Sequence, residues 1–139
     1  MKIRIFGAKL LPSPARKRQA LFVKACRFAL GRRAVRAEEL NLIFLTNPQM
    51  RRINKRFLGH DYNTDVIAFP YAVPPAFGDV YVSVDQARLQ AKDLGHSELE
   101  ELLTLAIHGT LHLLGFDDHS PAEKKRMFAK QDSILKRLK

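Results

Sequence analysis

The chain has 139 residues, 46% of them hydrophobic, which is enough to bury a core without disulfide bonds. Its single cysteine excludes an internal disulfide and a Cys-x-x-Cys motif, as expected in the reducing cytoplasm. The chain has 24 Lys and Arg against 14 Asp and Glu, a net charge of +10. This charge favours a polyanionic partner, but it does not by itself identify a function. Because no run of about 18 apolar residues predicts a membrane span, we expect one cytoplasmic domain over residues 1–139, without a membrane partner.

The predicted elements follow from hydrophobic periodicity and from Pro and Gly at the ends of helices. In chain order they are a strand at 2–6, a helix at 13–30, a strand at 40–46, a helix at 47–58, strands at 66–69 and 80–84, and helices at 85–94, 98–114 and 121–138. The adjacent prolines at 74 and 75 place a loop at 71–77. The pattern predicts an α+β fold, a four-stranded mixed sheet with about five helices packed on it. Met127 and Phe128 are assigned to the core rather than to a cofactor contact.

The segment from His108 to His119 contains the residues of a metal site. Two histidines four positions apart project from one face of the helix predicted at 98–114. Gly115 fits a helix that ends in a left-handed residue, after which Asp118 and His119 return towards the two rings. Catalytic zinc takes three protein ligands and keeps one open position. We therefore expect one Zn²⁺ per chain; the alternative is a pair of histidines satisfied within the core.

The same spacing occurs in metalloproteases with the motif H-E-x-x-H. In this chain Gly109 stands where those proteases carry the glutamate that acts as general base. The predicted metal helix is therefore zincin-like in its ligands, while its chemistry differs from that of a protease.

Several short motifs, in this order along the chain, resemble those of the YbeY endoribonucleases, also called ribosomal RNA maturation factors. In this chain they are T-D-V-I-A-F-P at 64–70, G-D-V-Y-V-S at 78–83, G-H-S at 95–97 and H-G-T-L-H-L-L-G-F-D from 108 onward, where the family has T-D-V-L-S-F-P, G-D-I-x-I-S, G-H-S and H-G-x-L-H-L-x-G-Y-D-H. The resemblance implies an α+β fold and a zinc-dependent endoribonuclease of the single-strand type. It also implies action in small-subunit ribosomal RNA maturation and ribosome quality control, with RNA and the small ribosomal subunit as partners.

Two positions depart from the family pattern. The family's third metal ligand is a histidine ten residues after the first; this chain has Asp118 there and His119 next to it. Carboxylate and imidazole both bind zinc, and register favours Asp118 over His119. The family's functional arginine aligns with Leu58, which leaves Arg56 or His60 to supply positive charge as the catalytic residue.

Basic residues on the helix predicted at 47–58 are candidates for RNA binding: Arg51, Arg52, Lys55 and Arg56. We expect them to contact phosphates near the metal; the alternative is a solvated helix face. Two rival functions remain, a metalloprotease, which Gly109 disfavours, and a ribosome-assembly protein without catalysis, in which the metal is structural.

Overall fold

The computed structural model describes residues 2–32, 39–71 and 78–139. Its strands are β1 (Lys2–Phe6), β2 (Glu39–Leu45), β3 (Val66–Pro70) and β4 (Gly78–Ser83). They form one sheet in the order β1-β2-β4-β3, in which β1, β2 and β4 are parallel and β3 is antiparallel to β4. The predicted four-stranded mixed sheet of an α+β fold is confirmed. The loop predicted at 71–77 lies, except for Tyr71, outside the described residues.

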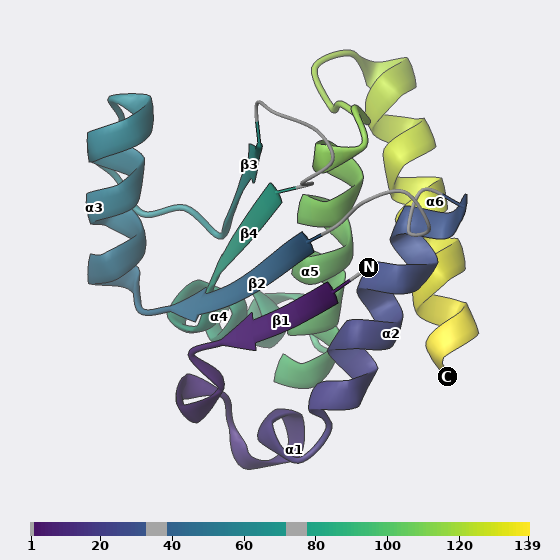
Figure 1. The fold of residues 1–139 in the computed structure, drawn as a ribbon, viewed down its shortest axis with the longest axis horizontal. Coiled ribbons are helices and arrows are strands. Elements are labelled where there is room, and N and C mark those ends of the chain that lie inside the picture. The colour runs from purple at the N-terminus through teal and green to yellow at the C-terminus, as the bar shows by residue number, and fades with distance from the viewer. Residues whose placement is uncertain (1, 33–38, 72–77) are drawn as a thin grey trace.

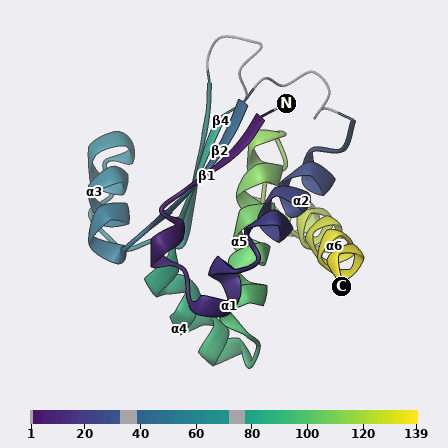
Figure 2. The same ribbon diagram turned by 60° about the horizontal axis from the view of Figure 1, so that its bottom comes forward.

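The described residues form six α-helices, one more than predicted. They are α1 (Ser13–Arg16), α2 (Gln19–Leu30), α3 (Asn47–Leu58), α4 (Val84–Leu94), α5 (Glu98–Leu113) and α6 (Pro121–Leu138), with a short 3-10 helix at Ala8–Leu10. Helices α2, α5 and α6 lie on one side of the sheet and α3 lies on the other (Figures 1 and 2). Within the described ranges, none of the helices combines the length and the apolar character that crossing a bilayer requires.

The continuous helix predicted at 13–30 is wrong, because the chain breaks after α1 and restarts as α2. Arg18 has a non-helical backbone, and the N-cap of α1 is Pro12, which provides no side-chain capping hydrogen bond. The side-chain amide of Gln19 donates to the carbonyl of Arg16, 3.2 Å away. A side chain therefore satisfies a carbonyl that the broken helix leaves without its backbone partner, which periodicity alone does not reveal.

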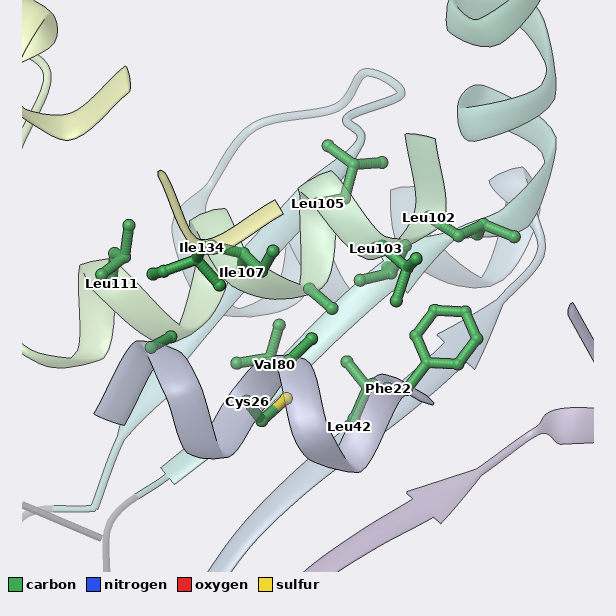
Figure 3. Close-up of a cluster of buried hydrophobic side chains, with 14 of the residues drawn as sticks. Phe22, Cys26, Leu42, Val80, Leu102, Leu103, Leu105, Ile107, Leu111 and Ile134 are labelled. Carbon is green, nitrogen blue, oxygen red and sulfur yellow. The ribbon is translucent and has the colours of Figure 1, made fainter. Parts of the chain in front are cut away.

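The core lies between the sheet and the three helices of one side (Figure 3). Helix α5 runs through its centre and is the most buried helix, in agreement with its apolar circumference. Its side chains pack against Leu42 and Val80 of the sheet, Phe22 and Cys26 of α2, and Ile134 of α6. Since α5 also carries His108 and His112, the candidate site sits at the end of the most firmly packed element.

Two phenylalanines on the described helices are exposed, and one of them, Phe128, is predicted to lie in the core. Phe57 on α3 has 61% of its surface accessible and packs its ring edge-on against Phe69. Phe128 on α6 is 38% exposed, and the centre of its ring lies 6.2 Å from the centre of the His108 ring. Met127 is fully buried, as predicted. Periodicity places residues on a face, but it does not tell how far the neighbouring element covers that face.

Candidate metal centre and RNA cleft

The last turns of α5 bring the two histidine side chains together. The Nε2 atoms of His108 and His112 are 3.0 Å apart, and the rings meet nearly at right angles, with centroids 4.6 Å apart. Both side chains are largely shielded from solvent, with 14% and 29% of their surface exposed. The four-residue spacing thus places two ring nitrogens at one point, as the sequence predicts for a metal-binding pair.

A glycine turn returns the chain to the same point. Gly115 has a φ of +94°, in the left-handed region that favours glycine, and the amide of Phe116 donates to the carbonyl of Leu111 across the turn. Asp118 follows, with its Oδ2 atom 3.7 Å from Nε2 of His108 and 3.9 Å from Nε2 of His112. Helix α6 then begins behind Ser120, whose hydroxyl accepts from the amide of Glu123.

The outer nitrogen of each histidine ring faces an oxygen acceptor. Nδ1 of His112 lies 3.0 Å from the carbonyl oxygen of Phe116, and Nδ1 of His108 lies 2.9 Å from Oε1 of Gln131. To donate in these bonds each Nδ1 must carry the hydrogen, so each neutral ring presents a bare lone pair at Nε2. The Nε2 lone pairs of His108 and His112 and the carboxylate of Asp118 then point to one place, and none of these three groups supplies a hydrogen-bond donor there.

Burial and the nearby His108 lower the pKa of His112, so its ring is neutral at neutral pH. Neutral imidazoles with hydrogen-bonded Nδ1 atoms are the form in which histidine binds metals. Bonds of about 2.0–2.2 Å in a tetrahedral zinc site would hold ligand atoms about 3.3–3.5 Å apart. The separations of 3.0, 3.7 and 3.9 Å bracket that range, so the donor set fits a zinc ion.

His119 does not join this cluster. Its side chain is 82% exposed and pairs with Asp117, with 3.1 Å between Nε2 and Oδ1. Among the described residues, two groups have ligand atoms close enough to hold a metal ion: His108 with His112 and Asp118, and Asp117 with Asp118 and His119. Both use Asp118, and the first is the better shielded from solvent.

Gly109 faces the sheet. A Cβ atom at this position would lie 2.4 Å from a methyl carbon of Val80 and 3.0 Å from one of Val66, both closer than ordinary contacts. Helix α5 therefore approaches β4 and β3 too closely for a glutamate at position 109. The base of the H-E-x-x-H proteases cannot be accommodated at this position, which argues against the metalloprotease alternative.

A hollow of about 400 Å³ lies between α3, β3 and His112, and we call it the α3 hollow. The described residues that line it are Asn54, Leu58, His60, Tyr62, Thr64, Val66, Ile67, Ala68 and His112. Leu58 and His60 thus share one depression with a candidate metal ligand. Arg56 is not among these lining residues. It lies two positions before Leu58 on α3, about 200° around the axis, and its guanidinium is 5.4 Å from the centre of the Phe57 ring.

A second depression, of about 520 Å³, lies on the other side of the cluster between α5 and α6, and we call it the acidic groove. The carboxylates in its lining are Asp65, Glu100, Glu101, Asp118 and Asp132, beside His96 and Lys124. Glu101 is buried and bonded to Nε2 of His96 at 2.8 Å. Asp118 and His108 face this groove, whereas His112 lines the α3 hollow, so the cluster separates the two depressions.

The basic residues of α3 fall into two pairs. Arg51 and Lys55 share the carboxylate of Asp61, at 2.8 Å and 3.7 Å, and the hydrogen bond from Arg51 lowers the pKa of Asp61. Arg52 and Arg56 have no carboxylate partner in the part of the chain that the structure describes. Two of the four predicted RNA-binding residues are thus free to meet a phosphate, while the other two are partly neutralised.

Comparison with known proteins decides the family. The family model described as "Endoribonuclease YbeY" matches residues 11–139. The chain belongs to the Endoribonuclease YbeY family. Endoribonuclease YbeY of Elusimicrobium minutum is 40% identical over 99% of this chain and 100% of its own length, and that of Bacillus licheniformis is 40% identical over 86% and 85%. The solution structure of TM1509 from Thermotoga maritima matches with a TM-score of 0.69 and 27% identity, covering 99% of this chain and 89% of that one.

Sequence reasoning missed three residues beside this YbeY site. Gln131 contacts His108 from 23 positions away, Tyr62 lines the α3 hollow, and Phe128 lies against the ring of His108. One feature of the sequence could have pointed to Gln131. It is a polar residue on the inner face of α6, where its neighbours Met127 and Ile134 are apolar and buried. Its partner is set by how α6 packs on α5, which local pattern does not encode.

Proposed function

We propose that this YbeY family member is a zinc-dependent endoribonuclease whose zinc is held by His108, His112 and Asp118. The observation that carries the proposal is the convergence of three acceptor atoms, two Nε2 lone pairs and a carboxylate oxygen, with no donor between them. Only a proton or a cation relieves such a cluster, and two neutral histidines with a carboxylate are a zinc donor set. Asp118 is preferred over His119 because His119 is turned outward to Asp117.

When bound, zinc lowers the pKa of a water molecule to about 7 and draws electron density from a phosphoryl oxygen. The protein supplies orientation. Gln131 and the carbonyl of Phe116 fix the tautomer and the angle of the two histidine rings. Asp118 is set by the glycine turn, so its carboxylate needs no large rearrangement to act as a ligand.

His60 is the preferred residue to stabilise charge on the phosphate. It lines the same hollow as His112, and its Nδ1 atom is 3.0 Å from the Tyr62 hydroxyl. When that hydroxyl donates to Nδ1, the ring hydrogen lies on Nε2 and is available as a donor. Arg56 is the weaker candidate, because it lies on another face of α3 than Leu58.

RNA approaches, in this proposal, along α3. Arg52 and Arg56 contact phosphates, and Arg51 and Lys55 contribute when their shared carboxylate on Asp61 releases them. The net charge of +10 supports a polyanionic substrate. We take the substrate to be ribosomal RNA of the small subunit, cleaved in its single-stranded regions in the cytoplasm during maturation and quality control. The YbeY-type motifs support this choice.

One observation favours a second function. Leu58 is 45% exposed in the α3 hollow and offers no hydrogen-bond donor to a phosphate, and losing one such donor typically lowers a rate by about 10²–10³. A ribosome-assembly protein that binds RNA and uses its metal for structure would tolerate leucine there.

Cleavage of an RNA with single-stranded loops separates the two functions. The wild type should cleave when loaded with zinc, lose activity to a chelator and regain it when zinc is restored, while His112→Ala stays inactive. Binding of RNA without cleavage would select the assembly protein. Cleavage that is equal in His112→Ala and insensitive to chelation would come from a contaminant and contradict the enzyme.

A further inference from the structure

Two rings stand together on the wall of the α3 hollow, between α3 and β3. The centroids of the His60 and Tyr62 rings are 5.2 Å apart and their planes differ by 14°, an offset stack. The Tyr62 hydroxyl lies 3.0 Å from Nδ1 of His60 and locks the rings to each other. Tyr62 is nonetheless 54% exposed, so a large part of its ring lies open.

A buried side chain holds this exposed pair in place. Asn54 is 2% exposed, and its side-chain amide donates to the carbonyl of Tyr62 at 3.0 Å. The backbone carbonyl of Asn54 also accepts from the amide of His60 at 3.2 Å. A buried residue thus holds two exposed residues in position through its side chain and its backbone. The pair is preorganised, which lowers the entropic cost of binding on it.

The surroundings select the ligand. The lining residues of the α3 hollow in the described part of the chain include no carboxylate, and the basic helix α3 forms one wall. The apolar side chains of Val66 and Ala68 line the same hollow as the ring pair and His112. An exposed ring face in a hollow lined without carboxylates, on a chain with a net charge of +10, suits a nucleobase joined to phosphate, because every base has a π-face and its backbone is anionic.

We infer that the His60–Tyr62 pair is a stacking platform for one unpaired nucleobase of the RNA, adjacent to the nucleotide that is cleaved. The inference rests on the proposed function and names the residues that would impose its preference for single-stranded RNA. A base in a duplex has its faces covered by its neighbours, so the platform accepts a base only from a single-stranded or looped segment. Preference for unpaired RNA is therefore built into the wall of the cleft.

Two variants of Tyr62 separate stacking from other roles. Tyr62→Ala should weaken the affinity for short single-stranded RNA about tenfold, within the range known for loss of one base–aromatic stack. Tyr62→Phe keeps the ring and should stay within about threefold of the wild type, since it loses one solvent-exposed hydrogen bond. Phe6→Ala is the matched control, because Phe6 is 47% exposed on β1, at the opposite edge of the sheet from β3.

The readouts are affinity as a function of salt, and fluorescence of 2-aminopurine placed at each RNA position in turn, followed on mixing with zinc-loaded protein. One position should be quenched by the wild type and Tyr62→Phe and not by Tyr62→Ala, while the salt slope and the zinc content stay unchanged. Equal affinity of Tyr62→Ala and the wild type, or equal losses in both Tyr62 variants, would overturn the platform while wild-type cleavage still stands. A wild type that neither binds nor cleaves RNA would instead overturn the proposed function, and the platform with it.

Discussion

The two depressions beside the candidate metal centre differ in charge. The α3 hollow has no carboxylate among its described lining residues and borders a basic helix, whereas the acidic groove collects five carboxylates around His96 and Lys124. A polyanion is repelled by the second and admitted by the first. Under the proposed function, this difference between the described linings favours the α3 hollow as the side from which RNA reaches the candidate metal centre. The other side supports the ligands, since Gln131 and Asp118 both lie in the acidic groove.

The largest effect in this comparison is expected at Gln131, which is buried and supports His108 from the acidic groove. Gln131→Met removes the acceptor for Nδ1 of His108 at similar volume, and we expect zinc affinity to fall by about 10- to 100-fold. Gln131→Glu keeps an acceptor for Nδ1 of His108, so this variant should retain most of the wild-type zinc affinity. Competition with a chromophoric chelator measures both variants, after urea unfolding has shown that they fold. Equal zinc affinity in Gln131→Met and the wild type would show that Gln131, in the acidic groove, does not support His108 as a ligand.

A matched pair of leucines tests which depression receives the phosphate. Leu58 lines the α3 hollow and Leu94 lines the acidic groove, and both are exposed. Leu58→Arg adds a donor beside the reacting phosphate and should raise the RNA cleavage rate by about tenfold, equivalent to about 1.4 kcal/mol. Leu94→Arg, with the same change of charge, should leave the rate near that of the wild type. An equal gain in both variants would reduce the effect to net charge and abolish the distinction between the two sides.

The smallest effect is expected at Asp61, which holds Arg51 and Lys55 on the outer side of α3. Asp61→Asn should free both cations, tighten RNA binding a few-fold and steepen its salt dependence by about 0.7 for each new phosphate contact. Asp93→Asn, on the exposed side of α4, is the control for the change in net charge. If both variants bind RNA equally, the α3 face is a solvated surface with no part in binding.

Much of the fold could be predicted from the sequence, because the signals that decided it are local. The apolar runs of β2 and β4 and the all-round apolar α5 follow from residue types a few positions apart. The break between α1 and α2 could not be predicted, because the apolar spacing continues through Arg18, whose backbone is not helical. The exposure of Phe57 and Phe128 depends on how far other elements extend, which is a property of packing.

The candidate site divides in the same way. His108, His112 and Asp118 lie within 11 residues of sequence, so helical spacing and one glycine turn sufficed to bring them together in the prediction. The α3 hollow combines a helix end, a connection and a strand with His112 from α5, and the role of Tyr62 there had no local signal. The hydrogen bond from Nδ1 of His108 to Oε1 of Gln131 likewise joins two helices, and their relative position comes from the packed core.

Metal content is the most direct test of the claim that His108, His112 and Asp118 together hold one zinc ion. It compares the purified wild type, Asp118→Ala and His119→Ala after dialysis against a weak chelator. We expect about one zinc per chain in the wild type and in His119→Ala, and much less in Asp118→Ala, because a ligand has been removed from only one of the two variants. Loss of zinc from His119→Ala with full retention in Asp118→Ala, or the same zinc content in all three proteins, would contradict the assignment.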